Sequence, residues 1–193
     1  MSKTTIPTAG LADDAVDLTS KVTGTLPTAN GGTGATSFTA GITMADAWRV
    51  TSNFTTDNLD PIASNWERND NNFDKIGTGM SNSSGVFTFP STGIYSIKFE
   101  TTWQYNGETG YTFAKIRFTS DNSSYANVSS SSAATADLGQ TAYQYLALSA
   151  LVDVTNVSTH KVRFAVSGQQ SVLFRGDSTD NQTWATFVRL GDT

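Results

Sequence analysis

The chain has 193 residues, enough for one domain and an appended segment, and 37% of its residues are hydrophobic while only 15% are charged. Its formal net charge of −5 argues against nucleic acid as a partner, because phosphate binding requires clustered Lys and Arg. Cysteine is absent, which excludes disulfides, and no run of about 18 apolar residues supports insertion into a membrane.

Residues 1–41 are rich in Thr, Gly and Ala and contain no Trp or Tyr. Such a segment cannot bury enough apolar surface to fold alone. It contains a short internal echo, TIPTAG at residues 5–10 and TLPTAN at residues 25–30, with Ile6 and Leu26 as apolar anchors. We therefore predict an extended N-terminal segment rather than a second globular domain.

From residue 42 onward the chain has the alternation of half-buried β-strands, with apolar side chains at every second position. Four segments show it: Tyr95–Trp103, Ala114–Phe118, Val162–Val166 and Trp184–Leu190. The run Tyr143–Val154 is more continuously apolar, which predicts a strand buried on both faces.

Turn sequences such as SNSSG at 81–85, PSTG at 90–93 and YNG at 105–107 separate these segments. About ten strands at close spacing are typical of an all-β sandwich or jelly roll. We expect no helix of useful length, only one short turn within 65–74.

The segment GVFTFPSTGIY at 85–95 resembles the C1q/TNF-like jelly roll, in which a strand ends in Phe-Pro and a Gly precedes the aromatic that opens the next strand. The final WATFVRLG at 184–191 resembles the last strand of that family, and FDKI at 73–76 resembles a short early strand. The resemblance implies a C1q/TNF-like jelly roll over residues 42–193, and it implies trimers.

A second resemblance lies in residues 22–36, VTGTLPTANGGTGAT, which are similar to a segment of bacteriophage tail-fibre proteins. It implies a homotrimeric fibre with residues 1–41 as its stem. Glycine suits a crowded three-fold axis, because it allows close approach of backbones and positive φ. The candidate stem and trimer contacts are Ile6, Leu26, Asn30, Gly31, Gly32 and Gly34.

No sequence motif indicates catalysis, and we expect neither catalytic residues nor a cofactor. The run Gly31–Gly34 lacks the Gly-Lys-Ser/Thr ending of a phosphate-binding loop, so a turn of the fibre is favoured. No Gly-x-Ser-x-Gly elbow occurs.

Two features bear on metals, and for both we favour an ordinary structural role, with no metal bound. The acidic residues between Glu67 and Asp74 do not have the spacing of an EF-hand, so a polar turn is favoured over a calcium site of another kind. His160 is the only histidine and is expected in a surface turn, although three copies could meet on a trimer axis.

Two loops are candidates for contact with a receptor, because aromatic and amide side chains suit recognition of a sugar or a protein. The first loop lies between Trp103 and Tyr111. Both of these residues are expected in the core, so the residues between them are the candidates for binding. The second loop is the polar, Ser-rich segment Asp121–Ser132. The candidate contacts are Tyr105, Asn106, Glu108, Asn122 and Tyr125.

These observations predict a virion protein, a homotrimeric bacteriophage fibre or fibre tip that attaches to a host-surface glycan or protein. The N-terminal segment would bind other virion proteins. The alternatives are a capsid-decoration or tail-adaptor protein and a cellular C1q/TNF-like ligand. The first residues, MSKTTIPTAG, lack the apolar stretch of a signal peptide, so synthesis in the host cytoplasm is expected.

Overall fold

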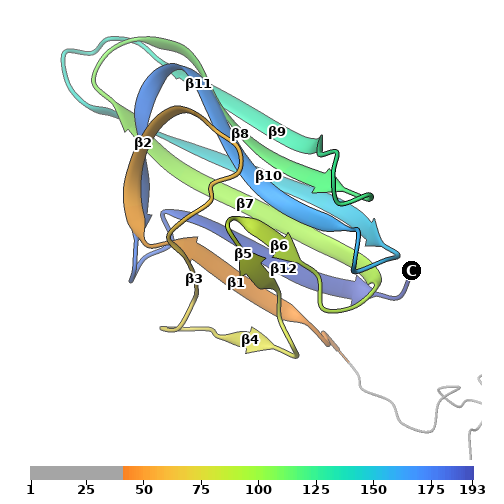
Figure 1. Ribbon diagram of the computed structural model, residues 1–193. Helices are drawn as coiled ribbons and strands as arrows, with labels where there is room; N and C mark the ends of the chain where they lie inside the picture. Colours follow the sequence, from red (N-terminus) through yellow and green to blue (C-terminus); the bar gives the residue numbers. More distant parts are fainter. Residues whose placement is uncertain (1–40) are drawn as a thin grey trace, which may run out of the picture. The chain divides into compact units, whose positions relative to one another are not determined.

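The computed structural model describes residues 41–193, which form twelve β-strands joined by antiparallel pairing (Figure 1). The described residues include no helix long and apolar enough to cross a bilayer. The strands are β1 (Ala45–Val50), β2 (Ser52–Leu59), β3 (Trp66–Arg68), β4 (Lys75–Ile76), β5 (Ser81–Ser83), β6 (Val86–Thr88), β7 (Gly93–Tyr105), β8 (Thr109–Thr119), β9 (Ala126–Thr135), β10 (Ala142–Val154), β11 (Lys161–Asp177) and β12 (Thr183–Gly191).

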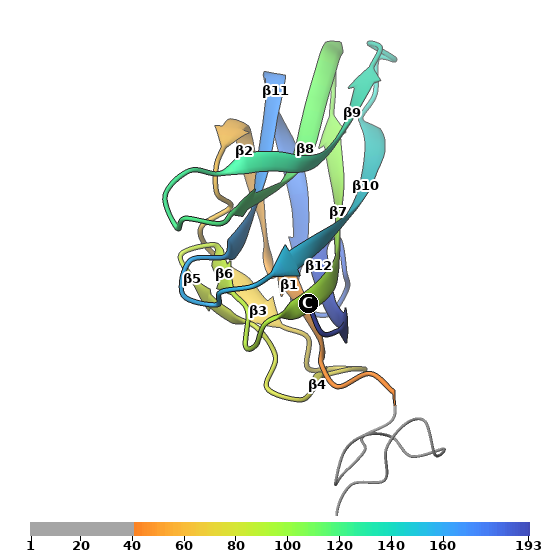
Figure 2. The ribbon, with the colours of Figure 1, turned by 90° about the vertical axis from the view of Figure 1, so that its right-hand side faces the viewer.

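The strands form two layers (Figure 2). In the first, called the β10 sheet, the order is β3–β1–β12–β7–β10, with β4 also paired to β1. In the second, called the β9 sheet, β5, β6, β11, β8 and β9 lie side by side and β2 pairs with β11. Strand β11 joins the layers, because Phe174 near its end pairs with Trp103 of β7. This arrangement is the predicted all-β jelly-roll sandwich.

The core lies between the layers and is built from the predicted alternation. Tyr95, Ile97 and Phe99 on β7 are fully buried, as is Trp103. Phe87 of β6 is central, because its ring contacts four other aromatic rings at centroid distances of 5.2–5.5 Å. Those rings belong to Trp48, Trp66, Phe164 and Phe187.

The turn that leads into β7 requires a glycine at position 93. Its φ of +143° lies where side chains are strained, and a Cβ atom there would lie 2.5 Å from both Arg189 Nε and the carbonyl oxygen of Gly191. The Arg189 side chain crosses the turn, and its Nε donates to the carbonyl oxygen of Thr92 at 2.9 Å. The glycine of the Pro-x-x-Gly pattern therefore lets the start of β7 pack closely against the end of β12.

A buried carboxylate, Asp46 of β1, holds the segment that leads from β3 to β5. Its Oδ1 accepts a hydrogen bond from Arg68 Nε at 2.9 Å, and its Oδ2 accepts one from the Met80 backbone N–H at 2.6 Å. The indole of Trp48 donates to the same Oδ2. Gly79 makes this approach possible, since a Cβ atom there would lie 2.7 Å from Asp46 Oδ2.

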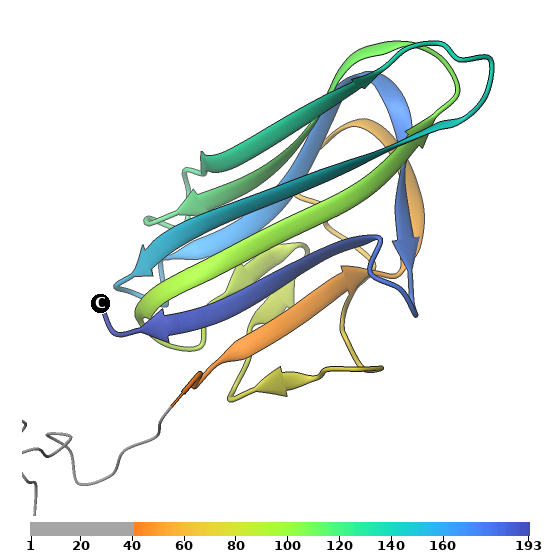
Figure 3. The same cartoon turned by 180° about the vertical axis from the view of Figure 1, so that it is seen from behind.

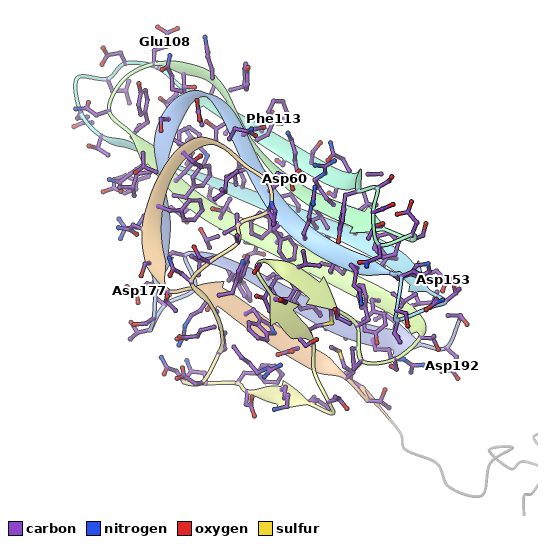
Figure 4. All side chains as sticks on the ribbon, in the orientation of Figure 1. Asp60, Glu108, Phe113, Asp153, Asp177 and Asp192 are labelled. Atoms are coloured by element: carbon purple, nitrogen blue, oxygen red, sulfur yellow. The ribbon has the colours of Figure 1, made fainter. Side chains whose placement is uncertain are left out.

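The two ends of the sandwich are distinct, and they are called proximal and distal below. At the proximal end the chain enters at Ile42, because Ala45 pairs with Val188 near the C-terminus. The turns 120–125 and 155–160 lie at this end as well. Loops 106–108 and 136–141 lie at the distal end; Figure 4 shows Glu108 there and Asp153 and Asp192 at the proximal end.

Three expectations about local structure need correction. Instead of one short turn, residues 65–74 contain strand β3 and a loop. The Ser-rich region after residue 125 forms β9, an edge strand. Twelve strands occur in the described residues rather than about ten, because strands of two or three residues are too short to show an alternation. Residues Ile42–Thr193 make up one compact unit, and the division of the chain at residue 41 stays a prediction.

We expect Asp46→Asn to lower the free energy of unfolding by about 3–5 kcal/mol, because it removes one charge of a buried ion pair and leaves Arg68 uncompensated. Urea denaturation of residues 42–193 measures the change. Asp74→Asn is the control: this carboxylate is 68% exposed and pairs only loosely with Lys75, so its loss should change stability by about 0.5 kcal/mol or less. Equal losses in both variants would contradict a structural role for Asp46.

Candidate interaction surfaces

The outer face of β10 is apolar and uncovered. Tyr143, Tyr145 and Leu151 point away from the core and are 58%, 55% and 69% exposed. Between them Ala147 and Ser149 are exposed as well, whereas Leu146, Leu148 and Val152 on the opposite face are buried. The prediction that this strand is buried on both faces is wrong for the single chain, because no described segment covers the outer face of β10.

Polar neighbours hold the two tyrosines of this strip in place. The Tyr145 hydroxyl donates to Glu100 Oε2 on the neighbouring strand β7. Burial, followed by the hydrogen bond to Glu100 and the charge of Glu100, raises the pKa of Tyr145 to about 12. The Arg175 guanidinium lies 5.8 Å from the Tyr143 ring centroid, and it donates to Gln104 Oε1 at 3.2 Å.

Strands β1 and β12 lie toward the edge of this sheet that is opposite β10 (Figure 3). A groove of about 540 Å³ lies over these two strands, on the same face as the strip. Its floor is formed by outward side chains of β1 and β12, which include Ala47, Trp184 and Val188. The β3–β4 loop at 69–73 and the β11–β12 loop at 179–181 form its walls. The β10 sheet thus has an apolar strip along one edge and a groove near the opposite edge.

An ion-pair network shapes the groove wall. Arg49 on β1 is almost fully buried, and its Nη2 donates to Glu67 Oε1 and to Asp70 Oδ1, both at 2.6 Å. Burial lowers the pKa of Arg49, but its hydrogen bonds with Glu67 and Asp70 outweigh burial and raise that pKa above its ordinary value. The two carboxylates that the sequence placed in an acidic cluster therefore fasten the loop to the sheet.

The five predicted receptor contacts are divided between the two ends of the sandwich. Tyr105, Asn106 and Glu108 lie at the distal end, where Asn106 and Glu108 are exposed and Tyr105 packs partly against the core. Asn122 and Tyr125 lie in the β8–β9 loop at the proximal end. The structure brings the members of each group together but separates the two groups by the length of β8.

Two expectations about burial are wrong. Tyr111 was expected in the core but is 46% exposed, because Thr112 takes the inward position at this point of β8. His160 lies in the expected turn but is only 8% exposed, since its Nδ1 accepts the backbone N–H of Thr155 and its ring packs 5.4 Å from that of Phe118.

The six predicted stem and trimer contacts, from Ile6 to Gly34, lie outside the described residues. Within residues 41–193 no three His, Cys, Asp or Glu side chains are grouped to hold a metal ion.

Comparison with known proteins shows the fold. No family model matches the chain, and no curated protein is significantly similar in sequence. Solved structures of murine APRIL, a TNF-like jelly roll, match 76% of this chain. The structure at pH 5.0 has a TM-score of 0.56 at 11% identity and the one at pH 8.5 a TM-score of 0.53 at 10% identity, each over 98% of the APRIL chain.

We expect the Tyr145 hydroxyl to titrate near pH 12 and Glu100→Gln to move it toward the ordinary tyrosine pKa of about 10. Because the folded-state pKa is raised, the protonated phenol stabilises the fold below about pH 10, and this contribution is lost as the pH rises through 12. The difference in absorbance at 295 nm between the wild type and Tyr145→Phe isolates this group. A Tyr145 pKa unchanged in Glu100→Gln would contradict the role of Glu100.

Proposed function

We propose that this chain is a homotrimeric bacteriophage fibre or fibre-tip subunit that attaches the virion to the host surface. The jelly roll is the head, and residues 1–41 are the stem that binds other virion proteins. The similarity of VTGTLPTANGGTGAT at residues 22–36 to tail-fibre segments supports the phage assignment. The uncovered apolar strip of β10 is the observation that carries the self-association.

The β10 sheet offers both halves of a contact between copies. The strip of Tyr143, Tyr145 and Leu151 lies along one edge, and the groove over β1 and β12 lies toward the other edge of the same face. Insertion of the strip of one copy against the groove of the next makes a head-to-tail contact. Such contacts form a closed ring when the rotation between copies is right, and a trimer is the smallest such ring.

Attachment would be multivalent. Three heads per fibre raise the effective concentration of each binding surface, so overall binding can exceed that of one head by about 10²–10⁴. Ile42 enters at the proximal end, and the stem is covalently joined there. The surfaces available to a receptor are then the sides of the sandwich and the distal loops, which carry Asn106 and Glu108.

A second candidate, a cellular C1q/TNF-like ligand, is favoured by the likeness to murine APRIL structures. Quantitative mass spectrometry of purified phage particles separates the candidates. A fibre subunit should be present in a copy number divisible by three, and a cellular ligand should be absent from particles. A copy number in the hundreds would instead favour capsid decoration.

We expect the full chain to elute at three times the mass of one chain in size-exclusion chromatography with light scattering, and Leu151→Glu to shift it to the monomer. A charge at this 69% exposed apolar position would be desolvated by the neighbouring copy, which costs several kcal/mol. Leu138→Glu makes the same change at a 61% exposed position in the distal loop and should leave the trimer intact. A monomeric wild type, or equal dissociation of both variants, would overturn the proposed interface.

We also expect labelled chain to bind host cells saturably and to reduce adsorption of phage that carry it. Leu151→Glu should bind the same cells at least 10²-fold more weakly, because a monomer loses multivalency. Flow cytometry measures binding, with cells outside the host range as the control. No saturable binding by the trimeric wild type would rule out attachment and leave a structural role in the virion.

A further inference from the structure

The outer face of the β9 sheet concentrates positive charge in a protein whose net charge is −5. Lys115 and Arg117 point outward from β8, and Lys161 and Arg163 point outward from β11. These four residues, called the basic cluster, are a third of the twelve Lys and Arg residues of the chain. Arg117 and Arg163 are directly opposite one another in the pairing of the two strands, an arrangement that repulsion disfavours.

One carboxylate, Asp60, compensates this pair of arginines. Arg163 Nη2 donates to Asp60 Oδ2 at 3.0 Å, and Arg117 Nη1 donates to the same oxygen. A single negative charge neutralises only one of the two guanidinium groups. The nearby carboxylate of Asp121 is engaged in its own turn, where its Oδ1 accepts three hydrogen bonds from neighbouring hydroxyl and backbone groups.

The two lysines of the basic cluster have neutral partners. Lys115 Nζ donates to the Ser167 hydroxyl and Lys161 Nζ to the carbonyl oxygen of Val157, each at 2.8 Å. An ammonium group has three donors, so each lysine retains donors for an arriving anion. Neither lysine forms an ion pair with a carboxylate of the described residues.

The surroundings of the basic cluster suit a sugar. The exposed hydroxyl of Ser130 lies opposite Lys115 on β9, and the exposed amide of Asn127 lies opposite Arg117. The Tyr125 ring stacks on the Arg163 guanidinium at 3.9 Å, and the Tyr125 carbonyl oxygen accepts from Arg117 Nη2 at 2.5 Å. Aromatic, hydroxyl and amide groups beside cations can recognise the ring and the acidic groups of a charged saccharide.

We propose that the basic cluster binds an acidic glycan that carries carboxylate or phosphate groups. The anionic groups contact Lys115 and Lys161, and the sugar rings lie along β9 and Tyr125. The inference rests on the proposed attachment function and names the chemistry of its receptor. Because the basic cluster lies on the layer opposite the β10 sheet, the trimer contact leaves it open.

Calorimetric titration of the full chain tests this binding. The probes are oligosaccharides of polygalacturonate, which carry carboxylates, and of polyribitol phosphate, with neutral dextran oligosaccharides of equal length as control. We expect saturable binding of at least one acidic probe that weakens with added salt, and none of dextran. The probe that binds identifies the acidic group, and binding of neither acidic probe would overturn the proposal.

Two double variants with the same net charge locate the site. Lys115→Gln/Lys161→Gln should weaken binding about tenfold or more. Lys3→Gln/Lys75→Gln, which removes the same charge at two lysines outside the basic cluster, should leave it unchanged. Both variants spare the arginines that pair with Asp60, and circular dichroism confirms folding. Equal weakening by both would overturn the site, because it would indicate attraction to overall charge alone.

Cell binding separates failure of this inference from failure of the proposed function. If the wild type binds host cells and Lys115→Gln/Lys161→Gln binds them equally well, the basic cluster is not the receptor site while attachment stands. If the wild type binds no host cells, the proposed attachment function is wrong. The basic cluster is then not a receptor-binding site either. Loss of cell binding in that variant alone would support both.

Discussion

The Asp46 carboxylate is the contact on which the arrangement of the first third of the domain depends. It ties β3, through Arg68, and the start of β5, through the Met80 N–H, to β1. Arg68 lies 4.6 Å from the Trp48 ring centroid, and that ring packs on Phe87, so the polar cluster is continuous with the aromatic core. With β3 fixed, the 69–73 loop stands beside the sheet and the groove has its wall. A buried charge so placed costs desolvation, which explains why its donors surround it closely.

Much of the fold could be predicted because alternation along a strand is a local property. Strands β7 and β12 and the Pro90-to-Gly93 turn are visible in the sequence for that reason. The role of Asp46 is not, since its donors Arg68 and Met80 are distant in sequence and an Asp inside a strand usually indicates a solvent-facing position. For the outer face of β10 the error was the opposite one, because the sequence predicted burial and the structure shows exposed side chains. An apolar run indicates apolar side chains on both faces of a strand, and it does not distinguish a cover within the chain from one supplied by another copy.

The candidate surfaces were less accessible to sequence reasoning than the strands. Composition identified the loops around Asn106 and Tyr125, but only the direction of the strands shows that they lie at opposite ends. The basic cluster left a signal that could have been used, because Lys115 and Arg117, like Lys161 and Arg163, are two residues apart and so share a face. What the sequence lacks is the register that sets Arg117 against Arg163 and brings Asp60 to both.

The pairing of β1 with β12 has a consequence for how the protein is made. Ala45 lies beside Val188, so the first strand of the domain has no partner on its β12 side until β12 has left the ribosome. The sandwich therefore cannot be completed before β12 has been synthesised, and until then β1 and β7 present unpaired edges. Truncation of the chain before β12 would leave those edges open permanently. Premature termination before this strand should thus yield aggregated chains rather than shortened, partly active ones.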